Sequence, residues 1–215
     1  VYLRSDGYQE YKNILGPLGP ILYHSMFSLI SKKIQFISCR HHILRGKKGH
    51  VLEPSRLTGA WFNDLKNKKN DKIELLYVGR QKIEKGIFSL LNLMKKIDEE
   101  IQLTVVGVSS NDKVLNQKNI KTYPIQGEEI KLIEFYDACD VFVLPSFTEG
   151  HPMVLLEALA RLKPVIIFKD IDHVIGDKKG IFVSERSSTG FLEKIKHIVV
   201  HNNHILLIYL ILLYL

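Results

Sequence analysis

From residue 73 onward, short apolar runs alternate with stretches of helical periodicity. The runs are four or five residues long and rich in β-branched and aromatic residues, which is typical of strands. The predicted strands cover residues 75–79, 103–107, 121–125, 141–144, 165–168 and 180–183. An apolar stripe of helical period predicts helices over residues 87–97, 129–138 and 153–162.

This alternation of strand and helix indicates one fold class. Strands that are apolar on both faces are typical of a parallel sheet covered by helices on both sides. We therefore predict an α/β fold with a Rossmann-like, doubly wound parallel sheet. Right-handed crossovers place the loops after the strands on one edge, where ligands bind. The loops after Gly79, Gly107 and Leu144 are expected to face one crevice.

The first 45 residues contain a second pattern of this kind. Residues 1–4 predict a strand, 4–7 a turn, about 18–33 a helix and 35–39 another strand. The expected organisation is a remnant of a second Rossmann-like domain at 1–45, a linker at 46–71, a ligand-binding domain at 72–200 and an apolar tail at 201–215.

The apolar tail, HILLIYLILLYL from His204, is shorter than the roughly 20 residues that a membrane span needs. A buried helix, an interfacial anchor and a frameshifted or truncated end all fit its composition. The abrupt change of pattern after Asn203 favours the last.

Composition is that of a globular protein, with 46% hydrophobic and 25% charged residues. The net charge of +7 suits an anionic partner such as a nucleotide diphosphate, a phosphate-bearing acceptor or an anionic membrane face. It equally suits a Lys-rich soluble surface. The basic residues are scattered and not interleaved with aromatics, so nucleic acid is not expected as a partner.

The cysteines and histidines predict no metal site. Cys39 and Cys139 are far apart in apolar surroundings, which predicts buried thiols in a reducing compartment. The pair His41-His42 has no third ligand at a suitable spacing. The chain opens without an apolar leader segment, so a cytoplasmic location is expected.

The first chemically informative stretch is residues 144–160, LPSFTEGHPMVLLEALA. A strand leads through a loop to Pro152, a favourable first helical residue, and the following helix N-terminus can bind an anion. Glu149 and Glu157 are candidate ligand-binding carboxylates. The simpler alternatives are a charge that stabilises the helix dipole at Glu149 and an i,i+4 ion pair of Glu157 with Arg161.

The second stretch is residues 79–86, GRQKIEKG. Arg80 and Lys85 place two cations in a loop between strand and helix, which suits a diphosphate leaving group whose negative charge grows as it departs. A solvated basic loop is the alternative. The glycine spacing matches neither a Walker A loop nor a GxGxxG dinucleotide fingerprint.

Together the two stretches resemble the donor half of GT-B glycosyltransferases of the retaining family 4, the glycosyl transferases group 1. The family pattern is Gly-Arg…Glu-Lys-Gly, then Pro-Ser…Glu-Gly…Pro…Glu-Ala, with seven residues between the two glutamates. Both elements occur here in that order, and the resemblance covers about residues 73–183.

The resemblance implies a role for each matching residue. Arg80 and Lys85 would hold the diphosphate, Glu149 the transferred sugar and Glu157 the ribose. The backbone near residues 124–127 would shape the base pocket. The implied catalytic residues are Glu149, Arg80 and Lys85, and the implied donor-binding residues are Gly79, Gly107, Gly150, His151, Pro152 and Glu157. No metal or cofactor is implied, because a nucleotide-diphosphate sugar serves as co-substrate.

The implied activity is transfer of a sugar, with retention of configuration, to a glycan or lipid-linked acceptor in glycan or surface polysaccharide synthesis. Such an enzyme would be cytoplasmic, with peripheral contact at the inner membrane face. Residues 4–7 are either an acceptor-side loop or a plain turn, and with an acceptor half of about 45 residues the enzyme is expected to be incomplete. Alternatives are another GT-B enzyme, such as a nucleotide-sugar epimerase or a phosphorylase, and a non-catalytic nucleotide-sugar-binding module.

Overall fold

A computed structural model describes residues 1–3, 6–39, 41–52, 55–66, 71–109, 117–176 and 178–213 of the chain, with side chains up to residue 201 except that of Tyr2. The chain divides into two compact units. The smaller unit is Val1–Arg56 with Thr148–Pro152, and the larger unit is Leu57–Phe147 with Met153–Leu215.

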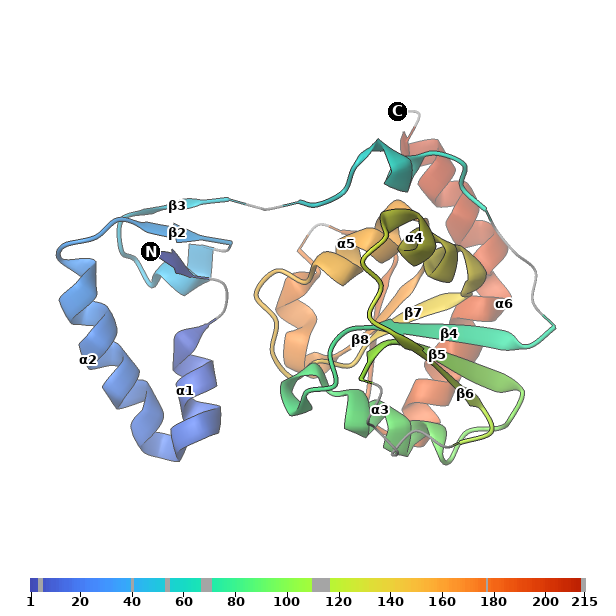
Figure 1. Ribbon diagram of the computed structural model, residues 1–215, viewed down its shortest axis with the longest axis horizontal. Coiled ribbons are helices and arrows are strands. Elements are labelled where there is room, and N and C mark those ends of the chain that lie inside the picture. Colours follow the sequence, from blue (N-terminus) through green and yellow to red (C-terminus); the bar gives the residue numbers. More distant parts are fainter. Residues whose placement is uncertain are drawn as a thin grey trace. The chain divides into compact units, whose positions relative to one another are not determined.

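The larger unit is built on a six-stranded sheet (Figure 1). Its strands are β4 (Ile73–Val78), β5 (Ile101–Val108), β6 (Ile120–Pro124), β7 (Val141–Leu144), β8 (Val165–Phe168) and β9 (Ile181–Ser184). They run parallel in the order β6-β5-β4-β7-β8-β9. Leu75 lies at the centre, paired with Leu103 of β5 and Val141 of β7. The predicted doubly wound parallel sheet is confirmed.

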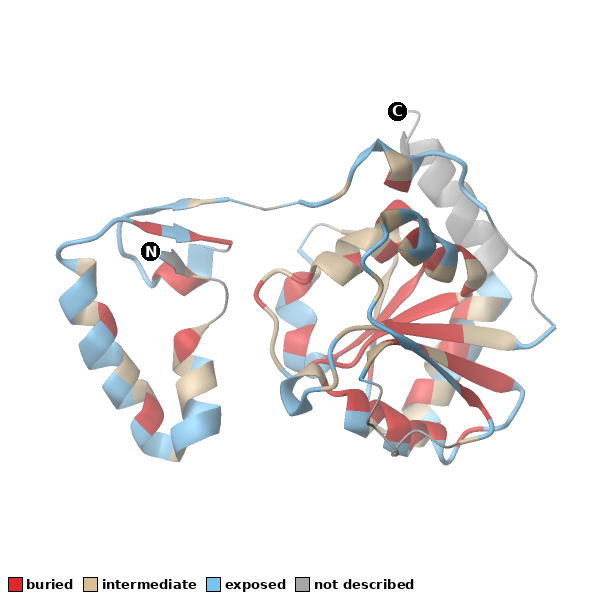
Figure 2. Cartoon of the chain, in the orientation of Figure 1, coloured by how far each residue is buried: buried red, intermediate tan, exposed pale blue. Residues whose placement is uncertain are grey.

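Helices cover both faces of this sheet. On one face α3 (Ile87–Met94) and α6 (Ser188–Leu213) pack against side chains such as Leu75 and Val143. On the other face α4 (Glu129–Ala138) and α5 (Met153–Ala160) pack against alternate residues such as Leu76 and Phe142. Each fully buried apolar side chain stabilises the fold by roughly 1.5–3 kcal/mol, and β7 and β8 are buried along their whole length (Figure 2).

The smaller unit has a three-stranded parallel sheet of β1 (Tyr2–Leu3), β2 (Phe36–Ser38) and β3 (Gly49–Val51), in that order. Its helices are α1 (Gly7–Leu15) and α2 (Gly19–Ser31). The core is small and aromatic, with the Phe27 ring stacked on Phe36 at a centroid distance of 5.0 Å.

Among the described residues, one stretch, Gly7–Ser31, has the length and apolarity of a membrane span. The structure folds this stretch into two helices. A 3-10 turn over Gly16–Leu18 separates them, and the Tyr8 and Tyr23 rings meet edge to face across the pair at 4.8 Å. Neither helix reaches the roughly 20 residues that a span requires.

Several sequence predictions for the smaller unit need correction. The helix predicted at about 18–33 is α2, but the preceding helix α1 was not predicted, and β3 falls inside the predicted linker. The predicted turn at 4–7 instead starts a helix: the Asp6 carboxylate caps α1 by accepting from the Tyr8 N–H at 3.0 Å, and Gly7 is the first helical residue. Arg4 and Ser5 lie outside the described residues.

The ends of the predicted larger domain also differ from expectation. The 3-10 turn Gly59–Phe62, predicted as linker, packs into the larger unit through the buried Trp61. The backbone of α6 continues through position 201 to Leu213, so the predicted tail is a continuation of a helix and not a separate element. Residues 214–215 lie outside the described part of the chain.

Candidate functional site

The strand order of the larger unit reverses between β4 and β7. Chain connections run from β4 outward to β5 and β6, then return to β7 and continue to β8 and β9. In doubly wound sheets, ligands bind beside the carboxyl ends of the strands at this reversal. The two loops that begin there are Gly79–Gly86 after β4 and Pro145–Phe147 after β7, the loops that carry the two sequence motifs.

Direct contacts join these two loops. The Phe147 N–H donates to the Glu84 carbonyl oxygen at 3.0 Å. Gly86 has a φ of +68°, and a Cβ at this position would collide with the Pro145 carbonyl. Glycine is therefore required at position 86 by both backbone conformation and space. The last glycine of the GRQKIEKG motif keeps the loops after β4 and β7 in contact.

The predicted cations lie in the first of these loops. Arg80 is exposed, and Lys85 is partly buried at the end of a 3-10 turn over Ile83–Lys85. The Arg80 carbonyl oxygen accepts a hydrogen bond from the Tyr77 hydroxyl at 2.9 Å. The loop is thus fixed by a buried side chain of β4, while the Arg80 side chain remains accessible.

The predicted base-pocket residues lie beside this loop. Gly107, near the end of β5, has a φ of +108°, and a Cβ there would collide with the Gly79 carbonyl. The neighbouring strand β6 ends at Pro124, which pairs with Val108. The carboxyl ends of β4, β5 and β6 therefore bring Gly79, Gly107 and the 124–127 segment to one edge.

The second glutamate, Glu157, lies on α5. Its Oε2 accepts a hydrogen bond from the hydroxyl of Tyr136 on α4 at 2.8 Å. Tyr136 is fully buried. Burial, and then the adjacent Glu157 carboxylate, raise the pKa of Tyr136 well above its usual value, so the hydroxyl stays protonated and donates at neutral pH.

Arg161, which the simpler alternative pairs with Glu157, binds several other groups. Arg161 is 2% exposed and pairs with Asp137 at 2.8 Å. Its guanidinium also donates to four backbone carbonyls of the incoming chain, those of Ala60, Trp61, Asn63 and Asp64. Arg161 therefore holds residues 60–64, at the start of the larger unit, against α4 and α5.

The segment Thr148–Pro152 carries the remaining predicted residues, Glu149, Gly150, His151 and Pro152. It connects β7 to α5 in the sequence and groups with the smaller unit. Helix α5 begins at Met153, as predicted, and ends at Ala160, two residues before the predicted end. The structure of the larger unit thus brings Gly79, Arg80, Lys85 and Gly107 onto one edge of its sheet and places Glu157 on α5.

Sequence reasoning missed Arg186, which lies two residues after the end of β9. Its guanidinium lies between the rings of Phe147 and Phe168, at 4.1 and 4.3 Å from their centroids. It donates to the Pro145 carbonyl at 2.9 Å and pairs with Asp170 at 2.6 Å. A cation two residues after a parallel strand, on the ligand-binding edge, was the available signal. Arg186 fixes the start of the loop after β7.

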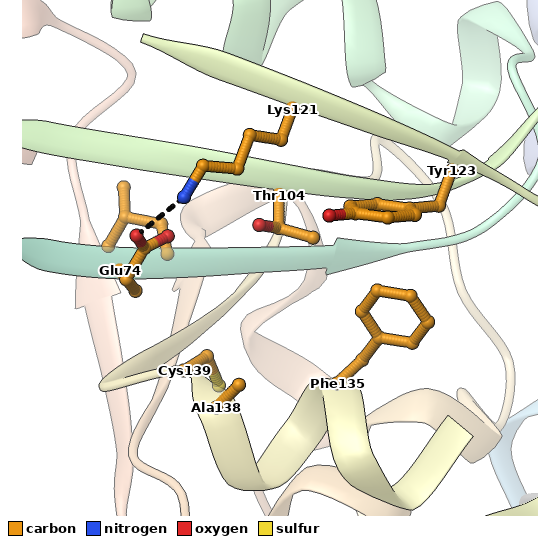
Figure 3. Close-up of a pocket in the computed structure, with 8 residues that line it drawn as sticks. Glu74, Thr104, Lys121, Tyr123, Phe135, Ala138 and Cys139 are labelled. Atoms are coloured by element: carbon orange, nitrogen blue, oxygen red, sulfur yellow. Dashed lines mark hydrogen bonds and ion pairs between the residues drawn. The ribbon is translucent and has the colours of Figure 1, made fainter. Parts of the chain in front are cut away.

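Sequence reasoning also missed a cavity of about 230 Å³ between the sheet and α4 (Figure 3). At one end Lys121 pairs with Glu74 at 2.9 Å. At the other end the rings of Tyr123 and Phe135 meet edge to face, with their centroids 4.8 Å apart. Glu74 and Lys121 lie near the amino ends of their strands, away from the reversal edge. None of the predicted donor residues lines this cavity.

Within the described residues, no group of three His, Cys, Asp or Glu side chains gathers as a metal site. Cys39 and Cys139 are both buried and form no disulfide, as predicted. Burial raises the pKa of the Cys139 thiol to about 12. This thiol is therefore neutral at physiological pH.

Comparison with known proteins decides the family. The family model described as glycosyl transferases group 1 matches residues 61–204, more than half of the chain. The chain belongs to the glycosyl transferases group 1. This match begins near the start of the larger unit and includes both motifs. It confirms the family that the motifs indicated.

Two curated relatives of this group 1 chain are the putative teichuronic acid biosynthesis glycosyltransferase TuaC of Bacillus subtilis and the capsular polysaccharide biosynthesis glycosyltransferase CapM of Staphylococcus aureus. Identity is 32% over 56% of this chain and 31% of TuaC. It is 29% over 60% of this chain and 37% of CapM. The chain thus spans about a third of the length of these relatives.

Among solved structures, the sucrose-phosphate synthase of Thermosynechococcus elongatus is similar with a TM-score of 0.70 and 18% identity. The alignment covers 93% of this chain and 58% of that one. Likeness at this identity supports the fold. The larger unit has the Rossmann-like fold of the C-terminal half of GT-B glycosyltransferases.

Proposed function

We propose that this group 1 chain forms the donor-binding part of a retaining glycosyltransferase that uses a nucleotide-diphosphate sugar. The observation that carries the proposal is the coincidence of the strand-order reversal with the two motif loops, which contact each other through Gly86 and Phe147. Arg80 and Lys85 would hold the diphosphate and stabilise its charge as the sugar departs. Glu157 would bind the ribose, and Glu149 would bind the transferred sugar, with Gly150 allowing close approach of the backbone. His151 and Pro152 would complete the donor-binding residues of this loop.

The same proposal extends to biological role. The two relatives are named for the synthesis of teichuronic acid and capsular polysaccharide. We infer an acceptor that is a glycan or a lipid-linked glycan, and a cytoplasmic enzyme with peripheral contact at the inner membrane face. The net charge of +7 supports contact with an anionic surface. Co-sedimentation with anionic, but not neutral, vesicles would test this membrane contact.

Nucleotide binding by the chain tests the donor site. Titration with UDP, ADP and GDP in a calorimeter would identify the preferred base. Arg80→Ala and Glu157→Ala should each weaken binding by about tenfold or more, because each removes a charge-assisted contact. Lys131→Ala is the matched control, since Lys131 forms an exposed ion pair with Glu128 on the surface of α4. If both site variants keep their fold and bind nucleotide as tightly as the unaltered protein, the assignment of Arg80 and Glu157 to the donor site is wrong.

Turnover separates a transferase from a non-catalytic nucleotide-sugar-binding module. The chain would be incubated with a labelled sugar nucleotide and a glycan acceptor, and the product's anomeric configuration read by NMR. A product with retained configuration supports the proposal. Inversion contradicts the retaining mechanism, and binding without hydrolysis or transfer favours the binding module.

A further inference from the structure

Two buried tyrosines, Tyr77 and Tyr136, contact the two predicted parts of the donor site. Tyr77 lies on β4 in the core beneath α3 and α6, and Tyr136 lies on α4 in the core of the opposite face. Both rings are almost completely buried. A tyrosine in such surroundings must hydrogen-bond its hydroxyl, because an unpaired buried hydroxyl is costly. The choice of partner is therefore informative.

The Tyr77 hydroxyl reaches the phosphate loop. It donates to the Arg80 carbonyl oxygen at 2.9 Å. A Cβ at position 79 would lie only 2.8 Å from this hydroxyl oxygen, so the tyrosine passes directly against the glycine that opens the loop. The buried Tyr77 hydroxyl thus fixes the backbone of the turn that joins β4 to Gly79 and Arg80. The position of the Arg80 Cα, from which the exposed side chain extends, is fixed with it.

The Tyr136 hydroxyl reaches the predicted ribose ligand. It donates to Glu157 Oε2 at 2.8 Å, which is a charge-assisted hydrogen bond. The ring itself is held between Trp61 and Phe142, each with its centroid 5.5 Å away. A rigid ring that bonds one carboxylate oxygen fixes the orientation of that carboxylate.

We propose that Tyr77 and Tyr136 are positioning residues of the donor site, Tyr77 for the diphosphate loop and Tyr136 for the ribose-binding carboxylate. The inference rests on the proposed function, because it assumes that Arg80 and Glu157 contact the nucleotide. It adds that the two contacts are oriented independently, one from each face of the sheet. Removing one hydroxyl should therefore impair recognition of one part of the nucleotide only.

The test compares Tyr77→Phe and Tyr136→Phe, which keep both rings in place. The dissociation constant of the preferred nucleoside diphosphate among UDP, ADP and GDP would be measured with those of its monophosphate and its 2′-deoxy and 3′-deoxy forms. Tyr136→Phe should reduce the preference for the ribose form by about threefold to tenfold and leave the preference for diphosphate over monophosphate unchanged. Tyr77→Phe should reduce the preference for diphosphate over monophosphate and leave the preference for the ribose form unchanged.

Two further variants separate positioning from general stabilisation. If Tyr136 acts through Glu157, then Tyr136→Phe should change ribose preference little in a Glu157→Gln background. Tyr8→Phe is the matched control, because it removes a hydroxyl that bonds His24 at 2.8 Å in the smaller unit. It should leave all dissociation constants unchanged.

Each outcome bears on a distinct claim. The inference is supported if Tyr136→Phe loses only the preference for ribose and Tyr77→Phe loses only the preference for diphosphate over monophosphate. Equal weakening of every ligand, or unchanged preferences in both variants, overturns it while leaving nucleotide binding intact. Failure of the unaltered protein to bind any of the three nucleotides overturns the proposed function, and this inference with it.

Discussion

The two units of this chain are both built on parallel strands, yet they are stabilised differently. In the larger unit, β7 and β8 are buried along their whole length and helices pack on both faces. In the smaller unit, β2 alternates buried and exposed residues, and the core consists mainly of Phe27, Phe36 and Leu44. Figure 2 shows the same contrast in α1 and α2, which are largely exposed.

The difference shows where a rigid binding site can be built. Loops keep a fixed geometry when the elements that carry them are well packed. The larger unit also uses polar side chains for this purpose: the buried Arg161 bonds its first residues, and the partly buried Arg186 bonds the loop after β7. The smaller unit relies on a partly exposed ion pair of Asp6 with Arg45 at 2.7 Å. Mutations should therefore cost more in the larger unit.

The largest effect is expected from Arg161→Ala. This change leaves Asp137 and the four carbonyls without their buried donor, and loss of one partner of a buried pair costs about 3–5 kcal/mol. Urea unfolding would measure the loss. Lys131→Ala, which breaks an exposed pair, should change stability by less than about 1 kcal/mol. Similar losses in both variants would remove the contrast between buried and exposed pairs.

Gly86→Ala should destabilise the larger unit by about 2–3 kcal/mol, because alanine is strained at this positive φ and its methyl group meets Pro145. Nucleoside diphosphate binding should weaken as well, since the two motif loops must separate. Gly59→Ala is the control, because a Cβ there meets nothing within 4 Å and Gly59 belongs to the larger unit but not to the predicted site. If the two variants are equally stable, the loops are not held together as described.

The Cys139 thiol should make stability depend on alkaline pH. Its pKa is raised from 9.0 to about 12 in the folded protein, chiefly by burial. Below pH 9.0 the thiol is neutral in both states, whereas above it only the unfolded chain loses the proton, so stability falls as pH rises. By about pH 10.5 the protein should lose about 1–2 kcal/mol more than Cys139→Ala does. Urea unfolding would measure the stability of both proteins against pH. If the two stabilities fall in parallel above pH 9.0, the thiol does not contribute as predicted.

Asp6→Ala should have the smallest effect, about 1 kcal/mol, and only in the smaller unit, because it removes the N-terminal cap of α1. Hydrogen exchange of the α1 amides would report it. Asp6→Asn keeps a capping oxygen but loses the ion pair with Arg45, so its exchange should stay closer to that of the unaltered protein. Faster exchange in α4 would show that the two units are coupled.

The apolar pattern alone predicted much of the larger unit. Residues 129–138, 141–144 and 165–168 form α4, β7 and β8 with the predicted bounds. Buried parallel strands carry a strong signal, because both of their faces must be apolar. The pattern failed for α1, which has a polar sequence, and for β3, which has only three residues. Such elements are decided by the contacts they make and not by their own periodicity.

For the site, the sequence determined which residues follow which strand, and so which cations and carboxylates are available at the ligand-binding edge. Only the tertiary structure decided what holds them there. The Tyr136 hydroxyl meets Glu157 across 21 positions of the chain, and Arg186 meets the Pro145 carbonyl across 41. Hydrogen bonds of this kind depend on how helices and strands pack around one core. A local pattern of residues does not predict contacts between positions so far apart in the sequence.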